Sequence, residues 1–95
     1  MNIQLTETAQ KTFYQITSKY SDSQATKFSI KTVAAIEIIA TNNCIGLRHK
    51  KTSFRKFLIS NQVYLFYKIQ NEILFIILFW DNKRNPLDLE VILSF

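Results

Sequence analysis

Basic side chains gather in two parts of this 95-residue sequence. Positions 47 to 69 carry six Lys and Arg residues and no acid, and two more cations follow the apolar run "ILFIILFW". Clustered like charges produce a strong local field, which favours a polyanionic partner such as nucleic acid or an acidic protein. The alternative is that these cations are only solvated surface charge. The candidates for binding phosphate or a target are Arg48, Lys50, Lys51, Arg55, Lys56, Lys83 and Arg84.

Few side chains are suited to transfer protons or to bind a metal. His49 is the only histidine, and histidine is the residue type most often used to transfer protons near neutral pH. Its neighbours Arg48, Lys50 and Lys51 are expected to disfavour its charged form. Cys44 is the only cysteine, so no internal disulfide and no metal-ligand spacing is present, and neither cofactor nor metal is expected. The catalytic candidates are therefore weak ones: Lys83, Arg84, Arg55 and His49.

Length and composition indicate one globular domain over residues 1–95. The hydrophobic fraction is 47% and the charged fraction 20%, which is typical of a chain that folds around one core. The longest apolar run, Ile73 to Trp80, is far shorter than the roughly 20 residues of a membrane-spanning helix. The N-terminus has no signal-peptide pattern. We expect a soluble cytoplasmic protein without a membrane partner.

The first half of the chain predicts a short strand, "NIQL", followed by two helices. Thr6 is a suitable N-cap, and apolar residues from Ala9 to Tyr20 recur at spacings of three and four along one helix face. Ser21 or Asp22 caps a second helix with a similar stripe, which "TNN" at 41–43 ends. Two such helices form an antiparallel pair that must cover another layer.

That layer is predicted from the second half. The runs "SFRKFLIS", "QVYLFYKI" and "EILFIILFW" are rich in β-branched and aromatic residues and are separated by turns at 60–61 and 70–72. They predict a three-stranded antiparallel meander, with "NIQL" pairing at an edge. On the middle strand, Tyr64 and Tyr67 fall on opposite faces, where packing is the expected role of each. The predicted fold class is α+β, a helical hairpin packed on an antiparallel sheet.

The order of these elements, with the strings "FRKFLIS", "YLFYKI", "NEILFIILFWDN" and "KRNP", resembles the RelE/ParE superfamily of type II toxin-antitoxin toxins. The resemblance covers most of residues 3–88. It implies a small basic toxin that a cognate antitoxin binds and neutralises, with a toxin-antitoxin hetero-oligomer as the expected assembly. RelE-like members cleave messenger RNA on the ribosome, whereas ParE-like members poison DNA gyrase.

Two features favour the ParE-like branch. Tyr64 stands where a RelE-like enzyme is expected to carry arginine, and the tail "LDLEVILSF" contains no Tyr or His to serve as its C-terminal catalytic group. The ending "KRNP" also looks closer to ParE-like chains. RelE-like RNA cleavage is the alternative. A third hypothesis, which does not use the resemblance, is a small nucleic-acid-binding domain with Phe54, Phe57 and Tyr64 as stacking surfaces.

The C-terminal tail is the candidate docking segment for the antitoxin. Few polar residues interrupt its apolar ones. Two alternatives stay open: the tail packs across the sheet as a last strand or helix, or it becomes ordered only when the antitoxin binds. The residues concerned are Val91, Ile92, Leu93 and Phe95.

Overall fold

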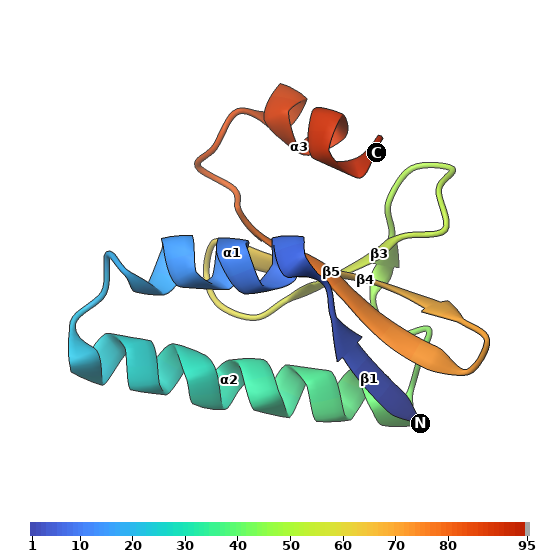
Figure 1. Ribbon diagram of the computed structural model, residues 1–95, viewed down its shortest axis with the longest axis horizontal. Coiled ribbons are helices and arrows are strands. Elements are labelled where there is room, and N and C mark those ends of the chain that lie inside the picture. Colours follow the sequence, from blue (N-terminus) through green and yellow to red (C-terminus); the bar gives the residue numbers. More distant parts are fainter. Residues whose placement is uncertain (95) are drawn as a thin grey trace.

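The computed structural model describes residues 1–94 and places three helices on the two faces of one sheet (Figure 1). One strand at the edge of this sheet, the two-residue β2 (Leu47–Arg48), has no counterpart among the strands predicted from the sequence. The elements are β1 (Asn2–Leu5), α1 (Glu7–Thr17), α2 (Asp22–Thr41), β2 (Leu47–Arg48), β3 (Arg55–Leu58), β4 (Val63–Gln70), β5 (Ile73–Asp81) and α3 (Pro86–Leu93). Within this described part, no helix is long and apolar enough to cross a membrane.

The sheet confirms the predicted α+β class and the meander. Its strand order is β1-β5-β4-β3-β2, and β3, β4 and β5 are consecutive antiparallel neighbours. The β4–β5 hairpin turns through Asn71 and Glu72, whose φ angles of 52° and 63° are those of a tight two-residue turn. One detail differs from the expected antiparallel sheet: β1 pairs with β5 in parallel, because α1 and α2 carry the chain away from the sheet edge after β1.

A β-bulge explains why β5 is apolar without strict alternation. Phe66 pairs with Leu78 but Tyr67 pairs with Ile76, so Ile77 is an extra residue in β5. The extra residue lets Ile76 and Phe79 both face the α1–α2 side, while Leu78 faces the α3 side. Both faces of β5 are covered by helices, as its continuous apolar run requires.

The helical hairpin packs as its stripes predict. Thr6 is the N-cap of α1 and Ser21 is the N-cap of α2, where Gln24 completes a capping box. Phe28 and Ile39 of α2 are buried against the α1–α2 side of the sheet. The helices therefore form one side of the molecule, with the sheet between them and α3 (Figure 1).

Two threonines, Thr6 at the N-cap of α1 and Thr12 within α1, continue the sheet edge where β1 stops. The Thr6 hydroxyl donates to the Ile77 carbonyl at 2.7 Å, and the Phe79 amide donates to the buried Thr12 hydroxyl at 2.9 Å. These bonds satisfy β5 polar groups that no strand reaches. They also hold α1 against the second half of β5, the strand that leads into the predicted basic pair Lys83 and Arg84.

The C-terminal tail forms a helix across the second face of the sheet. Asn85 is the N-cap of α3 and Pro86 occupies its first turn, where a missing amide hydrogen costs nothing. Leu89 is buried, and Ile92 and Leu93 pack half-buried against Phe66, Leu78 and Trp80. Of the two alternatives for this tail, the structure shows the one in which it packs across the sheet, and the packed tail is a helix. Phe95, the last predicted docking residue, lies outside the described residues.

Candidate phosphate-binding face

A line of two aromatic rings flanked by two cations crosses β3, β4 and β5 on the α3 side of the sheet. Lys56 Nζ lies 4.8 Å from the centroid of the Tyr64 ring. Tyr64 pairs directly with Trp80 across the β4–β5 ladder, so the two side chains share this face. Arg84 Cζ lies 4.6 Å from the centroid of the Trp80 ring. The register of the sheet therefore places a cation on each side of an aromatic pair.

A third cation extends this line along β4. Lys68 is on the same face as Tyr64, because the two residues are four positions apart on one strand. The Lys68 Nζ lies 5.9 Å from the Phe54 ring centroid. The ion pairs found among residues 1–94 do not include Lys56, Lys68 or Arg84. We call Lys56, Tyr64, Lys68, Trp80 and Arg84 the cationic face.

The electrostatic consequence is a surface suited to a strand of nucleic acid. Positive charge tracks the phosphate backbone, and exposed aromatic surface stacks on bases regardless of their identity. Trp80 is buried under Arg84 and α3, so it supports the line rather than stacking on a ligand. Tyr64 is half-buried and is the ring of this line that a ligand can reach.

His49 lies at the border of this face and binds α3. Its side chain is 9% exposed, its ring packs edge-on against Phe66, and its Nε2 lies 3.0 Å from Glu90 Oε1. Its partner is thus the carboxylate of Glu90, 41 positions away, which the sequence did not indicate beside the cations Arg48, Lys50 and Lys51. Lys50 Nζ also contacts Glu90 Oε1, at 2.9 Å. Both contacts join the β2–β3 connection to α3.

Two hydrogen bonds lower the pKa of the Glu90 carboxyl below its usual value. The bond from Lys50 has the larger effect and the bond from His49 the second largest. A lowered folded-state pKa means that the contact contributes stability at neutral pH and loses it as the pH falls through that lowered value. Glu90→Gln is therefore expected to speed hydrogen exchange of α3 amides at pH 7. The difference from the wild type should shrink as the pH falls and the wild-type carboxylate becomes protonated. Glu37→Gln on the exposed side of α2 is the control, and equal α3 exchange in the wild type and Glu90→Gln at pH 7 would contradict this role.

Arg55 is directed to the opposite face from Lys56. Its Nη1 donates to the Gly46 carbonyl at 2.9 Å. The Gly46 amide donates to the Tyr67 hydroxyl at 3.0 Å, and that hydroxyl donates to the Asn43 carbonyl at 2.8 Å. Burial raises the pKa of the Tyr67 phenol, so the hydroxyl stays protonated and available as a donor. Arg55 and Tyr67 thus hold the α2–β2 connection on the sheet, and the structure does not bring Arg55 into the cationic face.

The remaining predicted cations are scattered. Arg48 Nε donates to the Thr52 carbonyl at 2.9 Å within the β2–β3 connection, and Lys51 is exposed in the same connection. Lys83 lines a pocket on the α1–α2 side, whereas Arg84 lies over the Trp80 ring and also borders a neighbouring pocket beside α1. Among residues 1–94, no group of three or more His, Cys, Asp or Glu side chains is placed to hold a metal ion.

Sequence reasoning singled out Lys56 and Arg84 but missed the contribution of Lys68, Trp80 and Glu90. The period of two along β4 places Tyr64 and Lys68 on one face, so Lys68 carried a readable signal. The Tyr64–Trp80 pairing depends on the register beside the bulge. Glu90 contacts His49 from 41 positions away, and no local pattern indicates such a pair.

Comparison with solved structures shows which fold this is. A copper-bound mutant toxin from Helicobacter pylori matches with a TM-score of 0.64 at 18% identity, covering 87% of this chain and 96% of that one. YafQ from E. coli strain BL21(DE3) matches with a TM-score of 0.63 at 12% identity, covering 86% and 93%. The conserved hypothetical protein HP0894 from Helicobacter pylori matches with a TM-score of 0.51 at 19% identity, covering 88% and 97%.

These likenesses establish a shared fold. The chain shares its α+β fold, three helices and a five-stranded mixed sheet within residues 1–94, with the Helicobacter pylori toxin and with YafQ. No protein-family profile matches the sequence, and no curated protein matches it. The comparisons do not support the preference for the ParE-like branch that the missing catalytic groups suggested.

Proposed function

We propose that this chain is the toxin of a bacterial type II toxin-antitoxin system and that it cleaves RNA on its cationic face, in the manner of the RelE-like branch. The observation that carries the proposal is the line Lys56, Tyr64, Trp80 and Arg84, which combines phosphate-binding charge with a reachable aromatic ring. The fold shared with a Helicobacter pylori toxin supports the toxin class. The proposed place of action is the cytoplasm, where messages are translated.

The chemistry needs positioned charge more than a strong base. Attack of a ribose 2′-oxygen on the adjacent phosphorus breaks the bond from phosphorus to the 5′-oxygen and gives a 2′,3′-cyclic phosphate and a 5′-hydroxyl. Negative charge builds on the non-bridging oxygens, where cations are most effective. Lys56 and Arg84 are proposed to supply that charge, and Lys68 to hold the strand further along β4.

Tyr64 is the proposed proton donor of this site. Its phenol is half-buried next to Lys56, whereas the His49 imidazole is covered and bound to Glu90. A neutral phenol donates a proton, so Tyr64 is suited to protonate the departing 5′-oxygen while the 2′ proton passes to water. The tyrosine that replaces an expected arginine is thus assigned a chemical role.

The cognate antitoxin is the proposed partner, bound as a hetero-oligomer. Val91 is 57% exposed on the outer side of α3, while Ile92 and Leu93 are half-buried against the sheet. An antitoxin segment that packs on α3 and carries acidic residues would cover both Val91 and the nearby cations. Charge complementarity of this kind mainly raises the association rate and the specificity.

A cell-free translation reaction with a defined message tests the function. The chain is produced in the reaction, and the 5′ ends of the message are mapped by primer extension. New ends within translated codons are expected. An intact message together with a stabilised gyrase cleavage complex on added supercoiled DNA would instead assign the chain to the gyrase-directed branch. Salt-dependent binding to RNA with no cleavage would reduce the function to nucleic-acid binding.

A further inference from the structure

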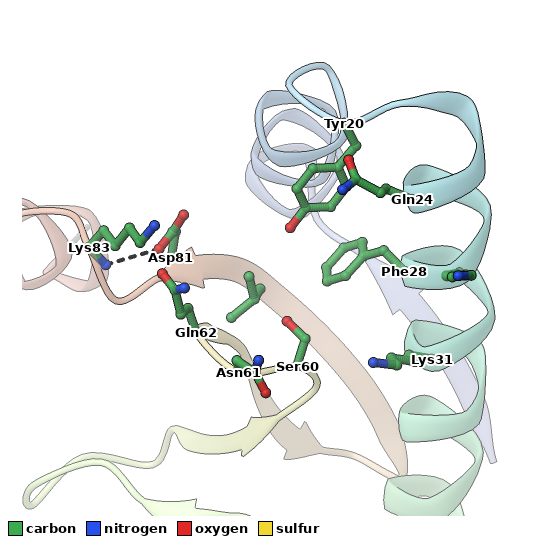
Figure 2. Close-up of a pocket in the computed structure, with 11 residues that line it drawn as sticks. Tyr20, Gln24, Phe28, Lys31, Ser60, Asn61, Gln62, Asp81 and Lys83 are labelled. Atoms are coloured by element: carbon green, nitrogen blue, oxygen red, sulfur yellow. Dashed lines mark hydrogen bonds between the residues drawn. The ribbon is translucent and has the colours of Figure 1, made fainter.

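A pocket of about 370 Å³ opens on the α1–α2 side of the sheet, opposite the cationic face (Figure 2). Its walls are the first half of α2, the β3–β4 connection and the turn after β5. This volume lies within the roughly 300–1,000 Å³ of small-molecule sites. A hydrogen bond from the Asn82 amide to the Gln62 carbonyl, 2.8 Å long, joins two of these walls.

The charge of the pocket favours an anion. Lys27 and Lys31 lie one turn apart on α2, and Lys83 comes from the turn after β5. In Figure 2, Lys31 and Lys83 enter from opposite walls. Asp81 is the one acid lining the pocket, and its Oδ1 accepts the Lys83 backbone amide at 2.9 Å. That bond holds the carboxylate at the Lys83 backbone, and three amines outnumber this single acid in the lining.

The uncharged groups of the pocket add a donor and an aromatic wall. The Gln24 Oε1 accepts the Ser21 amide at 3.1 Å in the capping box, so its NH₂ group is the end that remains to donate. Tyr20 is half-buried, and its ring stands edge-on to Phe28 with the centroids 5.8 Å apart. Figure 2 shows both rings turned into the pocket. The Gln24 donor and the amines of α2 near an aromatic ring match a phosphate joined to a planar base.

We propose that this pocket binds a nucleoside monophosphate group, with the phosphate against Lys27 and Lys31 of α2, the base against Tyr20, and Lys83 adding positive charge from the opposite wall. The same chemistry has two sources, a free nucleotide or the 5′-phosphorylated end of an RNA strand. The site lies on the other side of the sheet from the cationic face, and it does not depend on RNA cleavage. Binding here and cleavage there can therefore fail separately.

The test is a titration of the purified chain, made by cell-free synthesis, with AMP, ribose 5-phosphate and adenosine. AMP is expected to bind about tenfold or more tightly than adenosine, because charge-assisted hydrogen bonds to phosphate are the strong contacts. AMP should also shift the amide resonances of Asn61, Gln62 and Lys83. Equal affinities for AMP and adenosine, or shifts confined to the cationic face, would overturn the proposal.

Variants and a second ligand complete the test. Lys31→Gln is expected to weaken AMP binding about fivefold to tenfold, whereas Lys11→Gln, the same charge change on the exposed side of α1, should leave it unchanged. Equal weakening by both variants would mean non-specific attraction and would overturn the proposal. A 5′-phosphorylated tetranucleotide that binds more tightly than AMP identifies an RNA end as the source. Binding no tighter than AMP identifies a free nucleotide.

Discussion

Tyr64→Phe is expected to lower RNA cleavage at least about 100-fold, because a positioned proton donor typically contributes about 10² to 10⁴ to the rate. The ring that remains keeps the contact with Lys56 Nζ at 4.8 Å and the pairing with Trp80. The fold and RNA affinity should therefore stay close to those of the wild type. The measurement is the rate of appearance of new 5′ ends in the cell-free translation reaction, at matched toxin concentrations.

Tyr14→Phe is the matched control, because Tyr14 lies 72% exposed on α1, away from the cationic face. It should cleave at the wild-type rate. Lys56→Gln should reduce cleavage as well, but through weaker binding and weaker charge stabilisation together. Wild-type cleavage by Tyr64→Phe would remove the proposed proton donor, while leaving the cationic face as the place where RNA is bound.

Gly46→Ala is expected to destabilise the protein by about 2–3 kcal/mol, the upper part of the range for overpacking a filled site. A Cβ at this position would lie 2.8 Å from the Lys56 carbonyl oxygen and 2.8 Å from both Cε1 and Oη of Tyr67. Neither neighbour can yield easily, because Tyr67 is fully buried and the Lys56 carbonyl belongs to β3. The backbone of Gly46 does not have a positive φ, so space is the reason for this glycine.

Thermal unfolding measures this effect, and a fall in Tm of roughly 10 °C or more is expected for a domain of this size. Ser53→Ala, an exposed change in the following β2–β3 connection, should leave Tm within about a degree or two, as surface changes usually do. The Lys56 side chain points to the cationic face, on the other side of β3 from Gly46. A shift of β3 in Gly46→Ala would move Lys56 and should therefore also lower RNA affinity. An unchanged Tm would mean that the α2–β2 connection relaxes around the new methyl group.

The separation of the predicted cations follows from strand geometry. Arg55 and Lys56 are neighbours on β3 and point to opposite faces, one toward the Gly46 carbonyl and the other toward Tyr64. After the end of β5, Lys83 lines the pocket, and Arg84 lies over Trp80 while also bordering a second pocket beside α1. A block of charge in the sequence is therefore two surfaces in the fold. This is why a tally of basic residues indicated a polyanion partner without locating its site.

The sequence by itself determined the local structure, because spacing and capping act over a few residues. Thr6 and Ser21 start their helices, the apolar stripes select the buried faces, and the turns join three strands in order. Only the tertiary structure decided which distant groups meet. The parallel pairing of β1 with β5 and the contact of His49 with Glu90 each join residues more than 30 positions apart, and α3 packs on Phe66 of β4 as well as on the strand it follows. Such contacts depend on how whole elements bury their surfaces against one another, and no local spacing encodes them.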